Sequence, residues 1–430
     1  MIVAGPTEIV IITGGALKSN PRVLKEAETL ARHGYGISVL SNSIVSEEDS
    51  RLAAGGGFTF QSVLSEYPTV FGSENWRRIQ GRVALEAYRH CGLETRWLLG
   101  SQLSRMLGLA KQQNARCYIS HLEAGNWVGQ RLLRQGLPVA IDMEDWFSED
   151  LLPEARRNRP LGMLRRFETD LLNRGVYATS PSQSMSAALA GAYGCEPPAV
   201  IYNAFPWEDR STLDGLLKDR ADRRRPAIHW FSQTVGPGRG LEDLFAALPL
   251  LRHPAEIHLR GTPTAEFAAW FAKRVPEAWR DLVFVHDTVA PGELLSRIAE
   301  HDIGFAGEMK YCRSRDLTVT NKILQYLLAG LAVVASDTAG QQEVADQARG
   351  AALLYPSGDA EALAARLDEF LGSPERLSRA KAASLAAASK TFCWERQERT
   401  LLDCVERALR NDRTDLRPEA QPTLRGRIIV

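Results

Sequence analysis

The sequence lacks an excess of charge of either sign. Its 430 residues include 52 Lys and Arg and 52 Asp and Glu, so the formal net charge at pH 7 is zero. A domain that holds nucleic acid through its phosphates usually carries a marked positive charge. We therefore expect no nucleic-acid partner, although the balance leaves room for local basic clusters.

Cysteine is scarce and scattered. None of the six cysteines forms a C-x-x-C pair, and their spacing matches no zinc-binding pattern. Thiols stay reduced in the cytoplasm, whereas secreted proteins use cysteine for disulfides. The sequence therefore predicts a cytoplasmic protein with small, buried thiols at Cys91, Cys117, Cys195, Cys312, Cys393 and Cys404.

Long apolar runs are also absent. A membrane-spanning helix needs about 18 or more apolar residues in succession, and no window of the sequence provides them without charges. The first apolar run, between Glu8 and Thr13, is too short for such a helix and lacks the basic flank of a signal peptide. We interpret it as a first β-strand and expect no membrane span.

What the sequence does contain is an alternation of short apolar runs and helical stretches. Residues 9–12 form an apolar run, Pro21 opens a helix that reaches about His33, and residues 37–40 form the next run. Strand, helix and strand in this order make a βαβ unit, which implies a parallel sheet. The same pattern predicts strands at 117–120, 137–142, 175–179, 199–203, 228–232, 256–261, 282–286, 303–305, 332–335 and 351–355.

The length of the chain suits two domains of this kind rather than one core. A polar, arginine-rich stretch from Ala204 to Pro226 separates the two series of predicted strands. We predict an α/β protein with two Rossmann-like domains facing each other across a cleft, with residues 1–205 in the first domain and 206–392 in the second. Residues 411–430 are polar with two prolines and are predicted to form a loose tail.

The segment from Thr320 to Asp337 carries the clearest functional signal. It begins with Thr320, Asn321 and Lys322, continues as an amphipathic helix, stops at Gly330 and runs into a buried strand. The free N–H groups and the dipole at such a helix start favour negative charge. We therefore predict a phosphate-bearing ligand at this helix start, between the two domains.

Two further candidate features lie in the first half. Gly14 and Gly15 follow the first strand, where glycine lets backbone approach a ligand, although a tight turn needs glycine for steric reasons alone. His121 follows the strand at 117–120, at the end where parallel sheets bind ligands. Its imidazole could exchange a proton or a hydrogen bond with a ligand hydroxyl, or it could bond to loop backbone.

Carboxylates gather directly after the strand predicted at 137–142. The run from Asp142 to Asp150 includes Glu144 and Asp145 together with aromatic residues. Such a group could bind a divalent metal, bind hydroxyls or a basic group of a substrate, or cap a helix start. These residues alone leave the three alternatives open.

Several of these segments resemble retaining glycosyltransferases of the GT-B fold, family 4. That family commonly reads Asn-Lys-hydrophobic-x-Glu-Tyr before a glycine and a buried strand, and Asn321, Lys322 and Tyr326 match it with Gln325 in place of the glutamate. The segments Ser19–Val23, Phe231–Leu241 and Gly340–Glu343 are similar to further family motifs.

The chain departs from the family pattern at two kinds of position. Arg239 matches the lysine of the donor-domain loop, but Gln233 or Thr234 stands where the family has an arginine. The first of two family glutamates falls on Leu317. The missing cation could be supplied by Lys322, Lys310 or Arg315, and the missing carboxylate by Asp316 or Glu308.

The resemblance implies transfer of a sugar from a nucleotide diphosphate sugar to a carbohydrate, lipid-linked or other hydroxyl acceptor, with retention, in glycan or glycoconjugate biosynthesis. It implies no metal and no cofactor, and a helix at 393–410 that crosses back to the first domain. Catalysis is expected at His121, Glu144 and Asp145, and donor binding at Gly14, Gly15, Arg239, Thr320, Asn321, Lys322, Gln325 and Glu343.

Other interpretations stay open at this point. A GT-B sugar-nucleotide epimerase or hydrolase would use the same donor site, and the changes at Leu317 and Gln325 also fit a non-catalytic relative that binds sugar nucleotides. A last stretch suggests either a membrane-facing basic helix that reaches lipid-linked acceptors or an ordinary surface helix. It combines Arg156, Arg157, Arg159, Arg165 and Arg166 with Leu161, Met163, Leu164 and Phe167.

Overall fold

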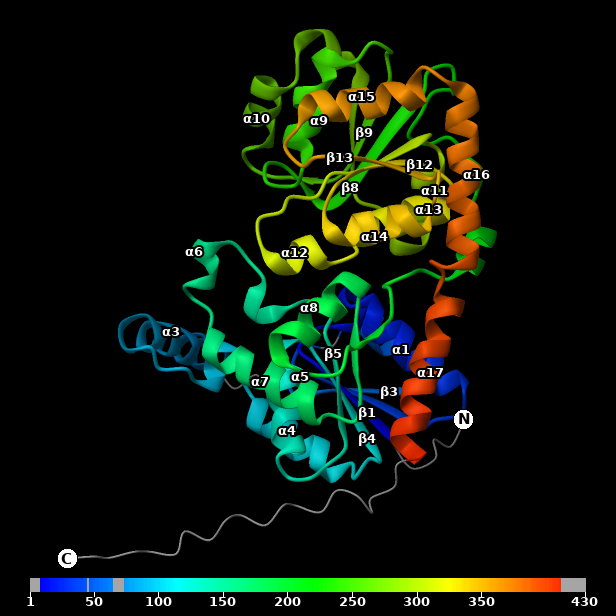
Figure 1. Ribbon diagram of the computed structural model, residues 1–430. Coiled ribbons are helices and arrows are strands. Elements are labelled where there is room, and N and C mark those ends of the chain that lie inside the picture. Colours follow the sequence, from blue (N-terminus) through cyan, green and yellow to red (C-terminus); the bar gives the residue numbers. More distant parts are fainter. Residues whose placement is uncertain (1–7, 45, 65–72, 411–430) are drawn as a thin grey trace, which may run out of the picture.

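The computed structural model describes residues 8–44, 46–64 and 73–410. These residues form two lobes, each built around one parallel sheet with helices packed on it (Figure 1). The predicted α/β class with two Rossmann-like domains is confirmed. The predicted tail at 411–430 lies outside the described residues.

The first sheet has the strand order β3-β2-β1-β4-β5-β6-β7 with every pairing parallel. The order reverses between β1 and β4, which is the point where open α/β sheets bind ligands outside the carboxyl ends of their strands. The strands are β1 Ile9–Thr13, β2 Ile37–Ser41, β3 Thr59–Ser62, β4 Cys117–His121, β5 Val139–Asp142, β6 Ala178–Ser180 and β7 Ala199–Val200.

The second sheet repeats this arrangement with the order β10-β9-β8-β11-β12-β13, again with parallel pairings. Its reversal lies between β8 and β11. The strands are β8 Ala227–Val235, β9 Glu256–Pro263, β10 Val283–His286, β11 Ile303–Ala306, β12 Ala332–Ser336 and β13 Ala352–Tyr355.

Helices connect successive strands in both domains. The first domain contains α1 Pro21–Arg32, α2 Glu47–Gly56, α3 Ser73–Cys91, α4 Leu103–Gln112, α5 Leu122–Leu133, α6 Pro153–Arg156, α7 Leu161–Arg174 and α8 Gln183–Tyr193. The second contains α9 Leu241–Ala247, α10 Phe267–Arg274, α11 Pro291–Ala299, α12 Arg313–Leu317, α13 Asn321–Ala329, α14 Ala339–Gln347, α15 Ala360–Leu371 and α16 Pro374–Lys390; α17 Trp394–Arg410 follows. Short 3-10 turns lie at 17–19, 96–98, 147–149, 207–212, 248–250 and 277–282.

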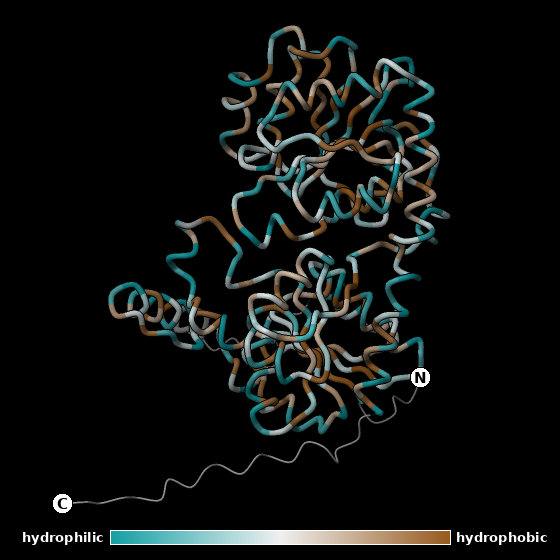
Figure 2. Tube along the Cα trace, viewed as in Figure 1, coloured by the Kyte–Doolittle hydropathy of each residue, from teal (hydrophilic) through white to brown (hydrophobic). Residues whose placement is uncertain are grey.

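Each sheet has an apolar cluster on both faces, which is why its strands read as continuous apolar runs. Figure 2 shows the hydrophobic residues concentrated in the interior of each lobe. Because both faces are covered, the ends of the strands are where polar chemistry can take place.

The chain returns from the second domain to the first through its last helix. After α16, helix α17 runs along the lower lobe beside α1 (Figure 1). Its Trp394 Nε1 donates to Thr29 Oγ1 of α1 at 2.8 Å, and Leu401 and Val405 join the core of the first domain. The two domains are thus linked twice, by the segment before β8 and by α17.

The arginine-rich stretch at 156–167 buries three of its four apolar side chains, and only Leu161 is partly exposed. Met163, Leu164 and Phe167 point into the core of the first domain and are at most 7% exposed. Arg165 and Arg166 pair with Glu149 and Glu94 instead. No helix within the described ranges has the length and apolarity to span a bilayer. The six cysteines are unpaired. Cys117, Cys393 and Cys404 are buried as predicted, whereas Cys195 and Cys312 are only partly buried and Cys91 is exposed.

Candidate functional site

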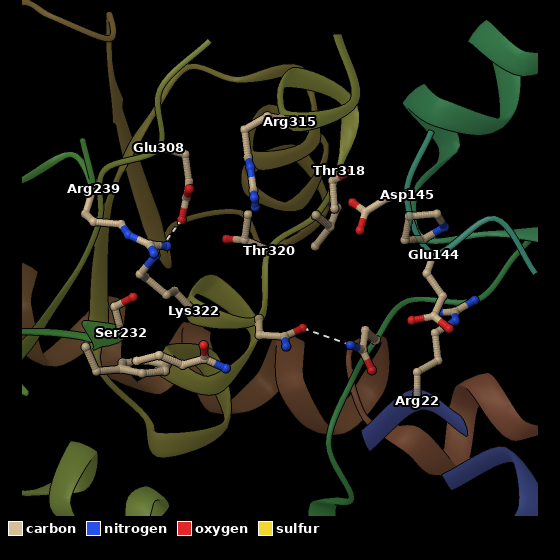
Figure 3. A pocket seen from close by; sticks show the side chains of 16 residues that line it. Arg22, Glu144, Asp145, Ser232, Arg239, Glu308, Arg315, Thr318, Thr320 and Lys322 are labelled. Atoms are coloured by element: carbon tan, nitrogen blue, oxygen red, sulfur yellow. Dashed lines mark hydrogen bonds and ion pairs between the residues drawn. The ribbon is translucent and has the colours of Figure 1, made fainter. Parts of the chain in front are cut away.

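A cavity of about 360 Å³ lies between the two domains. Its first-domain wall consists of Arg22, Glu144, Asp145, Pro181 and Asn203. The second-domain wall is larger and contains Phe231, Ser232, Gln233, Arg239, Glu308, Arg315, Thr318, Val319, Thr320, Asn321 and Lys322 (Figure 3). Both sets come from segments that follow strands or begin helices, so the cavity sits at the carboxyl ends of the two sheets.

The start of α13 forms part of the second-domain wall. Thr320 is the residue before the helix, with extended backbone, and its side chain makes no capping hydrogen bond. It is 7% exposed, and its Oγ1 atom has no hydrogen-bond partner among the residues that the structure describes. A buried hydroxyl without a partner, beside the free N–H groups of a helix start, is suited to an anionic oxygen of a ligand.

Three cations surround this helix start. Arg239 comes from the loop after β8, Arg315 from α12 and Lys322 from the first turn of α13 (Figure 3). Lys322 Nζ lies 2.8 Å from Glu308 Oε1, whereas Arg239 is exposed and has no ion pair within the described part of the chain. Burial opposes the charge of Arg315, but Glu308 and Tyr311 outweigh it and raise its pKa. One carboxylate thus faces three cations.

The first-domain wall presents Glu144, which is held by two neighbours. His121 Nδ1 lies 2.8 Å from Glu144 Oε1, and Asn20 Nδ2 donates to the same oxygen at 3.2 Å. Asn20 also caps α1, because its side chain accepts from Val23 N. The carboxylate is therefore fixed in place by a helix cap and a buried ring.

His121 lies behind this wall and not on the cavity surface. It is fully buried, and its Nε2 atom lies 2.5 Å from Glu26 Oε2. Burial lowers the pKa of His121, but the carboxylates of Glu26, Glu144 and Asp142 more than offset it and raise the pKa well above 6.5. An imidazolium with both nitrogens occupied cannot take up a further proton, so His121 is placed to position Glu144.

Arg22 completes the buried network. Its Nε and Nη2 atoms donate to the two oxygens of Asp142 at 2.6 and 2.9 Å, and Nη1 donates to the carbonyl of Ile201 at 2.7 Å. Burial raises the pKa of Asp142, but Arg22 and His121 outweigh it and the pKa lies below 3.8. Glu26, His121 and Asp142 offer oxygen and nitrogen atoms close enough for a metal ion, but Arg22 already fills both Asp142 oxygens and supplies the positive charge. These residues therefore fit a closed ion network better than a metal site.

Asp145 is the second carboxyl group of this wall. Burial and the nearby Asp150 carboxylate raise the pKa of Asp145 to about 7, although Arg315 opposes the shift. A carboxyl group that titrates near neutral pH can both release and accept a proton under physiological conditions. Asp145 is therefore the group on this wall best suited to proton transfer.

The structure brings together six of the residues chosen from the sequence and separates five. Glu144, Asp145, Arg239, Thr320, Asn321 and Lys322 line the cavity, whereas Gly14, Gly15, His121, Gln325 and Glu343 do not line it. Gly14 serves close packing, because a Cβ atom there would lie 3.1 Å from that of Ala124 in α5, whereas a Cβ atom at Gly15 would make only an ordinary contact with Leu122 at 3.4 Å. Gln325 is half-buried on α13, and its Oε1 atom lacks a partner among the described residues.

Glu343 connects the two domains away from the cavity. Its carboxylate accepts from the backbone N–H groups of Gln183 and Ser184, at the start of α8, at 2.8 and 2.9 Å. The hydroxyl of Tyr202 donates to it at 2.6 Å. This carboxylate therefore caps a first-domain helix, which the motif did not suggest.

Arg22 and Glu26 are site residues that were not predicted as such, although Arg22 lies in the family-like segment Ser19–Val23. They lie one turn apart on α1, on the same side as Thr29, and all three are at most 4% exposed. The signal was available in principle, because polar residues at i, i+4 and i+7 share one helix face. A charged stripe of this kind usually faces solvent, so it did not indicate a buried network.

The second domain contains a recognisable family segment. Residues 225–373, which make up most of this lobe, match the family model described as Glycosyl transferases group 1. No curated protein sequence matches the chain.

Solved structures share the fold of the whole chain at low sequence identity. HepE of Anabaena in complex with UDP superposes with a TM-score of 0.68 and 13% identity, covering 93% of this chain and 100% of that one. Sucrose-phosphate synthase of Thermosynechococcus elongatus gives 0.68 and 14%, covering 94% and 100%. A putative UDP-N-acetylglucosamine 2-epimerase of Listeria monocytogenes gives 0.55 and 12%, covering 96% and 98%. These likenesses show that the two domains are arranged in the GT-B fold.

Proposed function

We propose that the protein transfers a sugar, with retention, from a nucleoside diphosphate sugar to an acceptor hydroxyl. The observation that carries this proposal is the second-domain wall, where Arg239, Arg315 and Lys322 surround the start of α13 and the unpartnered hydroxyl of Thr320. With Glu308 counted against them, two positive charges remain uncompensated, which matches the charge of a diphosphate diester. The family segment at 225–373 and the UDP-bound neighbour support the same donor class.

The chemistry follows from where charge develops. As the bond between the sugar and the diphosphate breaks, negative charge grows on the leaving phosphate oxygens. Fixed cations and the N–H groups of α13 stabilise that charge without the reorganisation that water would need. No protein nucleophile is required if a phosphate oxygen of the donor takes the proton of the acceptor hydroxyl.

The first-domain wall would receive the acceptor. Glu144 is held rigidly by His121 and Asn20, so it can orient a hydroxyl without losing side-chain entropy. The acceptor hydroxyl releases one proton, and Asp145, which titrates near pH 7, is the alternative to the phosphate oxygen as the group that takes it. His121 is a positioning residue in this scheme.

The test is a binding screen with UDP, GDP and ADP followed by their glucose conjugates, read by thermal stabilisation of the full chain. A ligand that binds only the native state raises the melting point. We expect one diphosphate series to stabilise the protein and Arg239→Ala or Lys322→Ala to weaken its binding by about tenfold or more.

Lys310→Ala is the matched control. Lys310 is a nearby exposed cation that pairs with Asp337 at 2.9 Å and does not line the cavity. The Lys310→Ala substitution should leave the affinity for the nucleoside diphosphate unchanged. Equal affinity in wild type and in both cavity variants would remove the assignment of the donor site.

An epimerase or hydrolase of sugar nucleotides is the second candidate. Two observations favour it: the likeness to the Listeria epimerase fold, and a carboxyl pair in which Glu144 is fixed and Asp145 titrates near pH 7. Product analysis separates the candidates. A transferase releases one nucleoside diphosphate for each acceptor molecule that it glycosylates, whereas an epimerase or hydrolase converts the sugar nucleotide when no acceptor is present.

A further inference from the structure

The charges on the first-domain wall restrict what can bind opposite the donor. Arg22 is the one cation of that wall among the described residues, and its three nitrogens are bonded to Asp142 and to the Ile201 carbonyl. Glu144 and Asp145 therefore face the cavity with no uncommitted Lys or Arg from their own domain.

The hydrogen bonds that Glu144 makes lead to the same restriction. Glu144 receives bonds from His121 and Asn20 at Oε1, and its Oε2 atom has one weak contact, with Asn20 at 3.4 Å. A carboxylate accepts hydrogen bonds and cannot donate them. A group that meets Glu144 must therefore be a donor, either a hydroxyl or an ammonium.

The cavity carries an independent sign that a ligand belongs there. Thr320 is more than nine-tenths buried, lines the same cavity from the other domain and has an Oγ1 atom without a partner in the described ranges. Arg315 is the cation nearest to Asp145 from that side, and Figure 3 shows it beside Glu308 and Thr320, on the donor wall. It is best placed for the diphosphate and not for the acceptor.

We propose that the acceptor is a polyhydroxyl compound that is uncharged or carries an amine, as an amino sugar does, and that phosphate-bearing or carboxylate-bearing acceptors are rejected. This inference rests on the proposed function, because it names the substrate class of the same cavity. Rejection comes from like charge at Glu144 and from the lack of an uncommitted cation on the wall, where Arg22 is bonded to Asp142 and the amide of Asn203 donates to Asn321, and it is a repulsive form of specificity. Attraction comes from the hydroxyl and ammonium groups that the carboxylates can accept.

The experiment uses the full chain saturated with UDP and titrates it with glucose, glucosamine and glucose 6-phosphate, with binding followed by saturation-transfer NMR. We expect glucosamine to bind about tenfold or more tightly than glucose 6-phosphate, with glucose between them. In a Glu144→Gln/Asp145→Asn variant, which keeps the shape of the wall, the ratio should fall to about threefold or less. Glu154→Gln, an exposed change of the same charge on α6, should leave the ratio unchanged.

Two results would overturn the inference. Glucose 6-phosphate could bind most tightly to the wild type, or the order of the three sugars could stay the same when both carboxylates are neutralised. UDP affinity is measured first in each sample. If the wild type bound none of UDP, GDP and ADP, that result would count against the proposed function itself. Normal nucleoside diphosphate binding with a preference for the sugar phosphate would refute only the acceptor class.

Discussion

The positively charged side chains at the first-domain wall of the cavity are paired with buried carboxylates behind it. Those of the second-domain wall face the cavity instead. On the first wall, Arg22 and His121 are buried against Asp142, Glu26 and Glu144. On the second wall, Lys322 has one partner, Glu308, and Arg239 has none among the described residues. Two similar sheets thus end in one wall whose cations are paired and one wall whose cations face the cavity.

This difference indicates that the charged groups of the first wall contribute to folding stability and those of the second wall to ligand binding. Buried ion pairs are costly to break, because removing one partner leaves an unpaired charge in a poorly solvated place. Exposed cations contribute little to folding stability and are available to bind a ligand. The two walls should therefore respond differently to the same kind of substitution.

The largest expected effect is on stability, in the first wall. Arg22→Ala leaves Asp142 without its bidentate partner, so we expect a loss of about 3–5 kcal/mol in the free energy of unfolding, measured by urea denaturation. Arg239→Ala on the opposite wall should change it by less than about 0.5 kcal/mol. Arg32→Ala, which breaks the Arg32–Glu398 surface pair, is a second control expected below about 1 kcal/mol. If Arg22→Ala matches these controls, the buried network is not what holds the first wall.

The next effect is on turnover. Because the pKa of Asp145 is about 7, activity that uses it as a base should rise as pH passes through that value. Asp145→Asn should lower kcat about 100-fold and remove the pH step. The measurement is a pH profile of kcat/KM from 5.5 to 8.5, and an unchanged profile in the variant would exclude Asp145 as the proton-transfer group.

The two domains also bury histidine in opposite charge states. In the second domain, His229, His258 and His301 lie together, with ring centroids of His301 at 4.5 Å from both of the others. Burial and neighbouring positive groups lower the pKa of all three, that of His258 to about 3. The pKa of His121 is raised instead.

Acid should therefore weaken the second domain first. A histidine whose pKa is lowered in the folded state does not reduce the free energy of unfolding at a pH above its ordinary pKa of about 6.5. As the pH falls below 6.5, each such ring reduces the free energy of unfolding by up to about 1.4 kcal/mol per pH unit. The pH dependence of the stability contributed by His121 has the opposite sign. That contribution is fully present below pH 6.5 and is lost only as the pH rises through the raised pKa of His121. Hydrogen exchange at pH 7 and pH 5 should show β8 and β9 losing protection before β1 and β4; the reverse order would contradict this assignment.

The smallest expected effect concerns the contact between the domains. Glu343→Gln weakens the cap on α8 and should cost about 1 kcal/mol in thermal stability. UDP affinity should stay the same, because Glu343 does not line the cavity. A tenfold loss of UDP affinity would favour the family-based prediction that Glu343 contacts the donor.

Much of the fold could be predicted from the sequence because buried parallel strands appear as apolar runs. The strand β3 was not predicted, since Thr59–Ser62 is a short, half-exposed edge strand with a polar sequence. The other edge strands, β7, β10 and β13, were predicted because they lie in apolar runs, so the polar sequence of β3 is the reason that it was missed.

The site was predictable where it depends on local structure. Thr320, Asn321 and Lys322 lie at one helix start, so their neighbourhood follows from the sequence alone. The roles of His121 and Glu343 depend on contacts with Glu26 and with α8, more than 90 residues away along the chain. Only the packing of α1 on the first sheet and the docking of the two domains decide such contacts.

The most direct test of the donor site is a calorimetric titration with UDP and with UMP, for the wild type and an Arg239→Ala/Lys322→Ala variant. We predict that wild-type protein binds UDP about tenfold or more tightly than UMP, because the second phosphate meets these cations, and that the variant loses this difference while remaining folded. Equal preference for UDP in both proteins would contradict the placement of the diphosphate at the start of α13.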